Sequence, residues 1–192
     1  MLKIGLTGNI GSGKSLVAQI FSTIGIPIFD ADQQAKTVLN EPLILKKVLN
    51  VFGNSIFTND SIDREKLASL VFNNPYLLKQ LNDIIHPAVR SKFEEWYKNH
   101  LDKAFIIYEA AILFESGYYK NLDLMITVFS SPQLRIQRVI NRDKISRKLV
   151  QERMQNQWTD IRKNELANFV INNNSELLIP QVEEIYSKLV NS

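Results

Sequence analysis

Short apolar runs alternate with helical spacing along the first thirty residues of the chain. Residues 2–7 form an apolar run of strand length, and residues 26–30 form another. Between them, residues 14–23 carry apolar side chains at the spacing of a helix, and Gly25 follows as a stop signal. A strand, a loop, a helix and a second strand in this order predict the start of a parallel α/β sheet.

The pattern changes between residues 31 and 103, where few runs are β-branched and helical spacing recurs. We expect helices at residues 33–40, 43–52, 64–72, 75–85 and 87–100. Pro75 and Pro87 stand at positions where a helix can begin. This part, about 33–103, is therefore predicted to be a helical insertion between strands of the sheet.

Strand patterns resume after the insertion. They predict strands at residues 104–108, 124–129 and 169–171, and helices at about 132–141, 147–163 and 181–190. With the first two strands, the predicted sheet has five. The chain is thus predicted to be a single three-layer α/β domain with a parallel sheet, whose core comprises residues 1–32 and 104–192.

Composition narrows the chemistry that this domain can perform. The 192 residues include no cysteine and two histidines, and the net charge is +3. Disulfides, thiolate catalysis, cysteine-ligated zinc and a histidine-rich metal site are excluded, so a metal would be held by oxygen ligands, which favours Mg²⁺. The N-terminus lacks the apolar core of a signal peptide, and no apolar run is long enough to span a membrane, so we expect a cytoplasmic protein.

A glycine-rich loop carries the strongest functional signal. Residues 8–15, with the sequence GNIGSGKS, fit the phosphate-loop pattern G-x-x-x-x-G-K-[ST] in full, between a predicted strand and a predicted helix. In such loops the Lys14 ammonium binds the β- and γ-phosphates of ATP, and the Ser15 hydroxyl binds Mg²⁺. The alternative is a glycine turn that caps a helix and leaves Lys14 exposed. The expected ATP-binding positions of the loop are Gly8, Gly11, Ser12, Gly13, Lys14, Ser15 and Leu16.

Two features that the sequence lacks narrow the class of P-loop protein to which it can belong. There is no N-K-x-D motif for reading guanine, and the chain is short for a motor ATPase. A P-loop kinase that acts on a small molecule remains. The alternatives are another nucleoside, nucleotide or small-metabolite kinase, or a nucleotide-driven switch or nucleic-acid-binding ATPase, which the positive net charge would suit.

Two carboxylates follow the second predicted strand. Asp30 and Asp32 are two residues apart, so in extended chain both would point toward the crevice where α/β sheets bind ligands. A kinase that acts on an alcohol needs a carboxylate to orient the hydroxyl or accept its proton. Asp32 is predicted to be this base, and Asp30 is predicted either to hold the water ligands of Mg²⁺ or to orient the reacting groups. The alternative for Asp32 is that it caps the helix from Gln33.

Basic residues gather in the stretch from 135 to 153. Arg135, Arg138 and Arg142 have the spacing i, i+3, i+7, which places them on one helix face. Arginines neutralise the charge of a phosphoryl group during its transfer, so a phosphate lid is predicted at about 138–153, with Arg138 and Arg142 on ATP and Arg142 catalytic. The alternative is a solvated basic face. The clustering argues against a nucleic-acid surface.

A series of short motifs extends over essentially the whole chain. In order they are GLTGNIGSGKS at 5–15, FDAD at 29–32, FG at 52–53, DRxxL at 63–67, HPxxR at 86–90, ILFE at 112–115, QR at 137–138 with Arg142, RxxxQ at 153–157, and ANxxIxN at 167–173. Their joint order resembles the dephospho-coenzyme A kinase family. Three departures from its pattern are Leu16 in place of Thr, Ala111 in place of Pro and Asn168 in place of Asp.

The resemblance implies a specific reaction. A kinase of this family phosphorylates the ribose 3′-hydroxyl of dephospho-coenzyme A with ATP and Mg²⁺, the last step of coenzyme A synthesis. The acceptor would be bound by the helical insertion. From the sequence as a whole we expect no nucleic-acid or membrane partner and a monomer, with an oligomer as the alternative. The implied acceptor-binding residues are Asp30, Asp32, Arg64, His86, Arg90 and Glu115.

Overall fold

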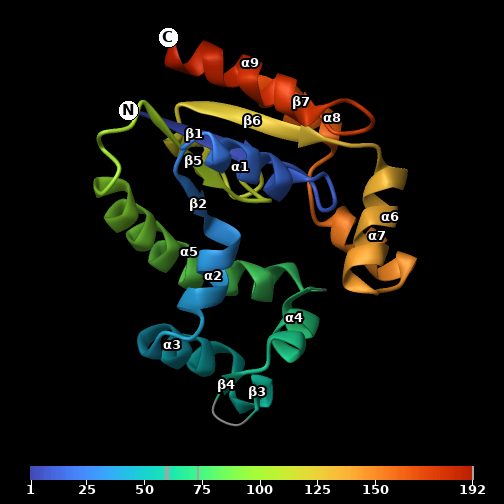
Figure 1. Ribbon diagram of the computed structural model, residues 1–192. Helices are drawn as coiled ribbons and strands as arrows, with labels where there is room; N and C mark the ends of the chain where they lie inside the picture. Colours follow the sequence, from blue (N-terminus) through green and yellow to red (C-terminus); the bar gives the residue numbers. More distant parts are fainter. Residues whose placement is uncertain (59–60, 73, 192) are drawn as a thin grey trace. The chain divides into compact units, whose positions relative to one another are not determined.

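The computed structural model describes residues 1–58, 61–72 and 74–191, and the chain divides into two compact units. One unit comprises Met1–Asp30 and His100–Ser192, and the other comprises Ala31–Asn99 (Figure 1). The first unit contains β1 (Leu2–Thr7), α1 (Lys14–Thr23), β2 (Ile28–Asp30), β5 (Phe105–Glu109), η2 (Tyr118–Asn121), β6 (Leu124–Phe129), α6 (Pro132–Asp143), α7 (Arg147–Gln155), α8 (Asp160–Leu166), β7 (Phe169–Asn172) and α9 (Leu178–Val190).

The first unit is built on the predicted five-stranded parallel sheet, in the order β2-β5-β1-β6-β7. The strand β1 is central, which explains its apolar sequence: Ile4 and Leu6 are fully buried. The register pairs Leu6 with Glu109 and Asp30 with Glu109, so the carboxyl ends of β1, β2 and β5 lie together. The α/β fold class is confirmed.

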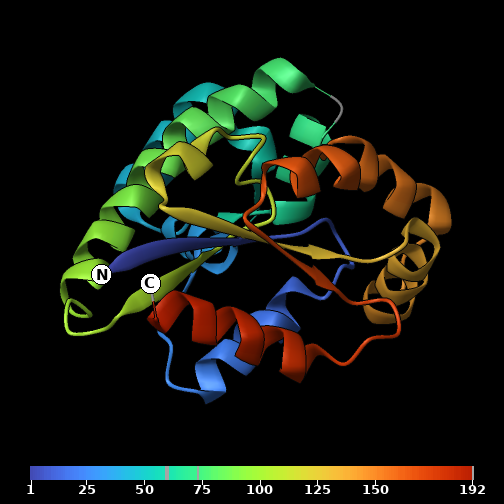
Figure 2. The same cartoon turned by 90° about the horizontal axis from the view of Figure 1, so that it is seen from above.

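Helices cover both faces of this sheet. Figure 2 shows α1 and α9 side by side on one face and α8 on the other. The core between the sheet and the first pair is apolar and includes Val17, Phe21, Phe105, Ile126 and Ile185. Burying each such side chain contributes about 1.5–3 kcal/mol, so this layer holds α1 and α9 against the sheet. A smaller cluster joins α6 to α7 through Ile136, Val139 and Val150.

The second unit contains α2 (Ala31–Val38), α3 (Pro42–Phe52), η1 (Asn54–Ile56), β3 (Phe57–Thr58), β4 (Ser61–Ile62), α4 (Arg64–Phe72) and α5 (Pro75–Lys98). The antiparallel pair of β3 and β4 was not predicted, because strands of two residues carry no periodic signal. The helices α2, α3 and α4 all pack on α5.

Pro87 does not begin a new helix, so the prediction of two helices at 75–85 and 87–100 was wrong. The helix α5 runs through it from Pro75 to Lys98. An interior proline costs about 3 kcal/mol, because it removes a hydrogen bond and crowds the preceding turn. Buried side chains at helical spacing lie on both sides of Pro87 in the sequence: Leu81, Ile85, Val89 and Phe93. The free energy gained by burying them outweighs that cost.

The prediction of a single helix at 147–163 was also wrong, because the structure has two helices there, α7 and α8, with a non-helical segment between them. Asn156 ends α7, and the Thr159 side chain caps α8 by accepting from the Arg162 N–H. The intervening residues Gln157 and Trp158 make contacts with the phosphate loop that a continuous helix would not allow.

Candidate active site

The phosphate loop lies between β1 and the N-terminus of α1 and depends on glycine at two positions (Figure 1). Gly11 has φ 79° and Gly13 has φ 92°, in the left-handed region that other residues rarely adopt. Space is also restricted: a Cβ on Gly11 would lie 2.6 Å from the Arg135 carbonyl oxygen, and one on Gly13 would overlap the Asn173 side chain. The sequence motif therefore reflects both dihedral angles and close packing.

Side chains from α6 and from the residues that directly follow β6 and β7 hold the second half of this loop by one carbonyl. Asn173 Nδ2 donates to the Ser12 carbonyl over 2.7 Å, and the Ser130 hydroxyl and Arg138 Nη1 lie 3.2 and 3.4 Å from the same oxygen. In a trans peptide the carbonyl and the next N–H point in opposite directions. Fixing the Ser12 carbonyl on this side therefore directs the Gly13 N–H to the other side, toward the position where the motif binds phosphate.

Lys14 and Ser15 meet on a buried carboxylate. Lys14 Nζ lies 2.8 Å from Glu109 Oε1, and the Ser15 hydroxyl donates to the same oxygen over 2.8 Å. Glu109 ends β5 and is 3% exposed, so its charge is matched by the ammonium rather than by water. The exposed-lysine alternative is contradicted, because the Lys14 side chain is 11% exposed.

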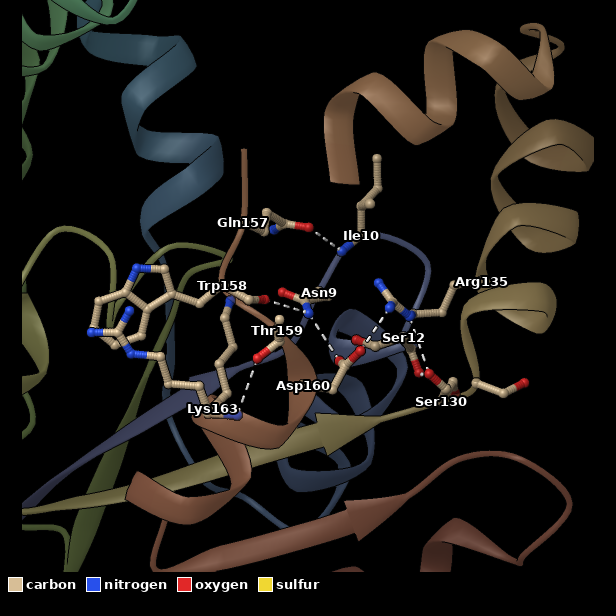
Figure 3. Close-up of polar contacts among 12 residues, drawn as sticks. Asn9, Ile10, Ser12, Ser130, Arg135, Gln157, Trp158, Thr159, Asp160 and Lys163 are labelled. Atoms are coloured by element: carbon tan, nitrogen blue, oxygen red, sulfur yellow. Dashed lines mark hydrogen bonds and ion pairs between the residues drawn. The ribbon is translucent and has the colours of Figure 1, made fainter. Parts of the chain in front are cut away.

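The first half of the loop is held from the segment between α7 and α8 (Figure 3). Gln157 Oε1 accepts from the Ile10 N–H over 2.8 Å. Asn9 Nδ2 donates to the Trp158 carbonyl over 3.0 Å and to Asp160 Oδ1 over 2.9 Å. Sequence reasoning found the motif but not these contacts.

The three arginines of α6 have different environments. Arg135 is buried and pairs with Asp160 at 2.6 Å; burial lowers the pKa of Arg135, and Asp160 opposes that shift. Arg138 is half-buried and also donates to the Asn173 carbonyl over 2.9 Å. Arg142 is exposed and pairs with Asp143 at 2.6 Å, which raises the pKa of Arg142. Arg135 is therefore held in a buried ion pair. The prediction that arginines of the lid bind ATP now concerns Arg138 and Arg142.

Glu115 lies in a structural ion pair in the first unit. Its Oε1 accepts from the Trp158 N–H and lies 2.8 Å from Lys163 Nζ, which also donates to the Ala111 carbonyl over 3.0 Å. Lys163 is 1% exposed, and burial lowers its pKa while Glu115 raises it. Among the described atoms, Glu115 Oε2 is buried without a partner. The predicted acceptor contact of Glu115 stays a prediction.

The comparison with known proteins decides the family. A family model described as dephospho-CoA kinase matches residues 2–178. A dephospho-CoA kinase of Bacteroides fragilis (strain YCH46) is 36% identical over 98% of this chain and 93% of its own length. The chain belongs to the dephospho-CoA kinase family. The resemblance inferred from the ordered motifs is thereby confirmed.

Solved structures agree with membership of the dephospho-CoA kinase family. The structure of dephospho-CoA kinase from Campylobacter jejuni has a TM-score of 0.69 and 28% identity, over 98% of this chain and 97% of its own. A crystal structure of a Thermus thermophilus protein has a TM-score of 0.86 and 30% identity, over 99% and 96%. The fold of the chain is therefore that of P-loop kinases in this family.

The carboxylates Asp30 and Asp32 are not arranged as an extended chain would place them. Asp30 ends β2 and is exposed, but α2 begins at Ala31, so Asp32 lies in the first helical turn. Because one carboxylate ends a strand and the other lies in a helix, the alternation of an extended chain does not describe the pair. The alternative that Asp32 caps a helix from Gln33 is also contradicted, because Asp32 is inside the helix.

The other predicted acceptor residues lie in the second unit. Arg64 begins α4, is exposed and donates to the Lys36 carbonyl over 3.1 Å. His86 and Arg90 are one turn apart on α5, and burial lowers the pKa of His86, as does the charge of Arg90. Their roles toward an acceptor stay predictions.

Glu109 is the residue of the candidate site that the sequence did not predict. The signal was available, because an acidic residue directly after a buried apolar strand must be paired or solvated.

Within the described residues, no group of three or more His, Asp or Glu side chains gathers as a metal-binding cluster. In the same part of the chain, no helix has the length and apolar character needed to cross a membrane.

Proposed function

We propose that this chain transfers the γ-phosphoryl group of ATP to the ribose 3′-hydroxyl of dephospho-CoA, giving CoA and ADP. In this step the 3′-oxygen forms a bond to the γ-phosphorus, and the bond from that phosphorus to the β–γ bridging oxygen breaks. The observation that carries the proposal is the convergence of Lys14 and Ser15 on Glu109 beside a glycine-dependent loop, in a chain of the dephospho-CoA kinase family.

The phosphate loop supplies the nucleotide site. The backbone N–H groups at the start of α1 and the positive end of its dipole favour phosphate oxygens. The Lys14 ammonium would move from Glu109 toward the β- and γ-phosphates when ATP arrives. The Leu16 N–H donates to the Gly13 carbonyl over 3.0 Å, so a phosphate contact from Leu16 requires that turn to open.

The donor set beside Lys14 fits Mg²⁺. The Ser15 hydroxyl and the Glu109 carboxylate are oxygen donors already 2.8 Å apart, and Mg²⁺ completes its ligands with water and substrate phosphates. We propose that Ser15 binds the ion directly and that Glu109 orients its water ligands. When bound, the ion neutralises charge on the β- and γ-phosphates. Glu109 would then face the water ligands of the ion instead of the Lys14 ammonium.

Asp32 is proposed as the group that accepts the proton of the 3′-hydroxyl. It lies two residues after β2, and the end of β2 is in register with Glu109. Arg138 and Arg142 are proposed to neutralise the transferring group, which requires Arg142 to exchange Asp143 for phosphate.

We further propose a cytoplasmic monomer that does not bind nucleic acid. Part of the basic stretch is used within the chain, since Arg135 pairs with Asp160 and both Arg142 and Arg153 pair with Asp143. Salt-sensitive binding of single- or double-stranded nucleic acid would contradict this part. Sedimentation of the purified chain tests the monomer.

The experiment for the main proposal is ADP release measured across acceptors. The purified chain is given ATP and Mg²⁺ with dephospho-CoA, adenosine, AMP or shikimate, and the product is identified by mass and by the position of the new phosphate. Dephospho-CoA should be used far better than the small acceptors. Equal or better use of a small acceptor would indicate a different metabolite kinase, and ADP release independent of any acceptor would indicate an ATPase.

A further inference from the structure

Asn9 connects the phosphate loop to two other parts of the chain. Its side-chain amide uses both hydrogens, one on the Trp158 carbonyl and one on Asp160 Oδ1. The backbone carbonyl of Asn9 accepts a hydrogen bond from the Ser12 N–H over 2.9 Å. Asn9 is 4% exposed, so water does not replace these contacts. The position of Asn9 therefore sets the position of Ser12, whose peptide directs the Gly13 N–H.

Asp160 divides its two oxygens between separate elements (Figure 3). Oδ1 accepts from Asn9 of the loop, and Oδ2 lies 2.6 Å from Arg135 Nη2 of α6. Arg135 also donates through Nε to the Ser130 carbonyl over 3.1 Å. The side chains of Asp160 and Arg135 are 15% and 4% exposed, so the pair is largely removed from water. A displacement of α6 is thus transmitted through one carboxylate to the loop.

We propose that Asp160 is a positioning residue for the phosphate site, which joins the first half of the phosphate loop to α6 through Asn9 and Arg135. The inference rests on the proposed function, since it concerns how the loop is shaped to bind and transfer phosphate. Asp160 itself would touch neither nucleotide nor acceptor. Its carboxylate keeps the Ser12–Gly13 peptide in the orientation that the phosphate requires while α6 carries Arg138 and Arg142.

Two variants test separately the contact of Asn9 with Asp160 and the ion pair of Asp160 with Arg135. Asn9→Ala removes the loop contact and leaves the Asp160–Arg135 pair intact. Asp160→Asn keeps an oxygen for Asn9 and removes the charge that pairs with Arg135. The matched control is Glu165→Gln, which changes an exposed acid on the same helix α8. The double variant Asn9→Ala/Asp160→Asn completes the cycle.

The measurements are kcat, the KM for ATP, the KM for dephospho-CoA, ADP affinity by calorimetry, and the melting temperature. Asn9→Ala and Asp160→Asn should each lower kcat/KM for ATP by about 10- to 100-fold, the scale of small misplacements in a site. The KM for dephospho-CoA should stay within about twofold, as should every value for Glu165→Gln. The losses of the two single variants should overlap, so the double variant is less impaired than their product.

A purely structural role gives a different result. It predicts a lower melting temperature for Asp160→Asn, with kcat/KM for ATP and ADP affinity unchanged well below that temperature. Unchanged nucleotide parameters in folded Asn9→Ala, or multiplicative losses in the double variant, would overturn the proposal. If Asp160→Asn does not fold, Asn9→Ala alone decides. ADP affinity needs no acceptor, so the inference can be judged even if wild-type chain fails to phosphorylate dephospho-CoA, which would instead reject the proposed function.

Discussion

Replacing Glu109 by glutamine tests the electrostatics of the phosphate site. The amide has the shape of the carboxylate and still offers one oxygen to Lys14 and Ser15, which both lie 2.8 Å from Oε1. The change therefore removes charge and leaves packing in place. Because Glu109 is 3% exposed and Lys14 is 11% exposed, water replaces little of the lost interaction.

The expected loss of stability follows from the two hydrogen bonds. The Ser15 bond becomes a neutral one and loses about 1 kcal/mol, and the Lys14 ammonium exchanges an ion pair for a bond to a neutral oxygen and loses about 1 kcal/mol more, so the change costs about 2 kcal/mol. For a chain of this length, that loss lowers the melting temperature by about 4–8 °C. Turnover should fall by about 100-fold or more, because the carboxylate proposed to orient the water ligands of Mg²⁺ is missing.

Differential scanning fluorimetry and ADP release measure both effects. A sharper reading comes from comparing ATP with and without EDTA. In the wild type, Mg²⁺ should increase the stabilisation by ATP, and in Glu109→Gln this increment should shrink. Glu165→Gln is the control for removing an acid elsewhere. Wild-type turnover together with an unaltered Mg²⁺ increment in Glu109→Gln would refute the assignment of Glu109 to the ion.

Four further predictions test other parts of the site. Asp32→Asn should cut turnover by about 100-fold while ATP affinity and melting temperature hold, since only the base is lost; surviving turnover would exclude that role. Arg142→Ala should slow single-turnover phosphoryl transfer more than it weakens ATP binding; unchanged chemistry would support a solvated face. EDTA should abolish turnover and added Mg²⁺ restore it, so activity that persists without metal contradicts the ion site. Burial and Arg90 hold the pKa of His86 below its unfolded value of about 6.5, against the weaker effect of Asp83, so the unfolded chain binds the extra proton and stability falls as pH drops below about 6.5. His86→Asn should reduce the fall in melting temperature between pH 7.5 and 5.5, and an unchanged profile would show that His86 does not contribute.

The sequence predicted the elements whose signals are local. The phosphate motif, the helix α1 and the strands β1 and β6 have the predicted bounds, because glycine placement and apolar periodicity are read within a few residues. The error at Pro87 has a tertiary cause: the packing of α5 overrides a local helix breaker. The break after α7 likewise depends on contacts of Gln157 and Trp158 with residues far away in sequence.

For the candidate site too, the sequence predicted local motifs but not the contacts between residues that are far apart in the chain. Lys14 and Ser15 follow from the motif, but their shared partner Glu109 lies on another strand and is identified by sheet register. Arg135 shows the converse. Its helical spacing with Arg138 is correct, but spacing cannot distinguish a guanidinium that binds phosphate from one buried on Asp160.

The phosphate loop receives its supporting side chains from the last third of the chain. Ser130, Gln157, Asp160 and Asn173 contact residues 9–12 across sequence separations of 118 to 161 residues. Contacts of such separation carry a large loop-closure entropy and form late in folding. An N-terminal fragment that ends before residue 157 would contain the entire motif and both glycines, but would lack the contacts of Gln157, Asp160 and Asn173 with the loop. During synthesis, nucleotide binding is therefore expected to be acquired only as the C-terminal segment emerges, although its signature is translated first.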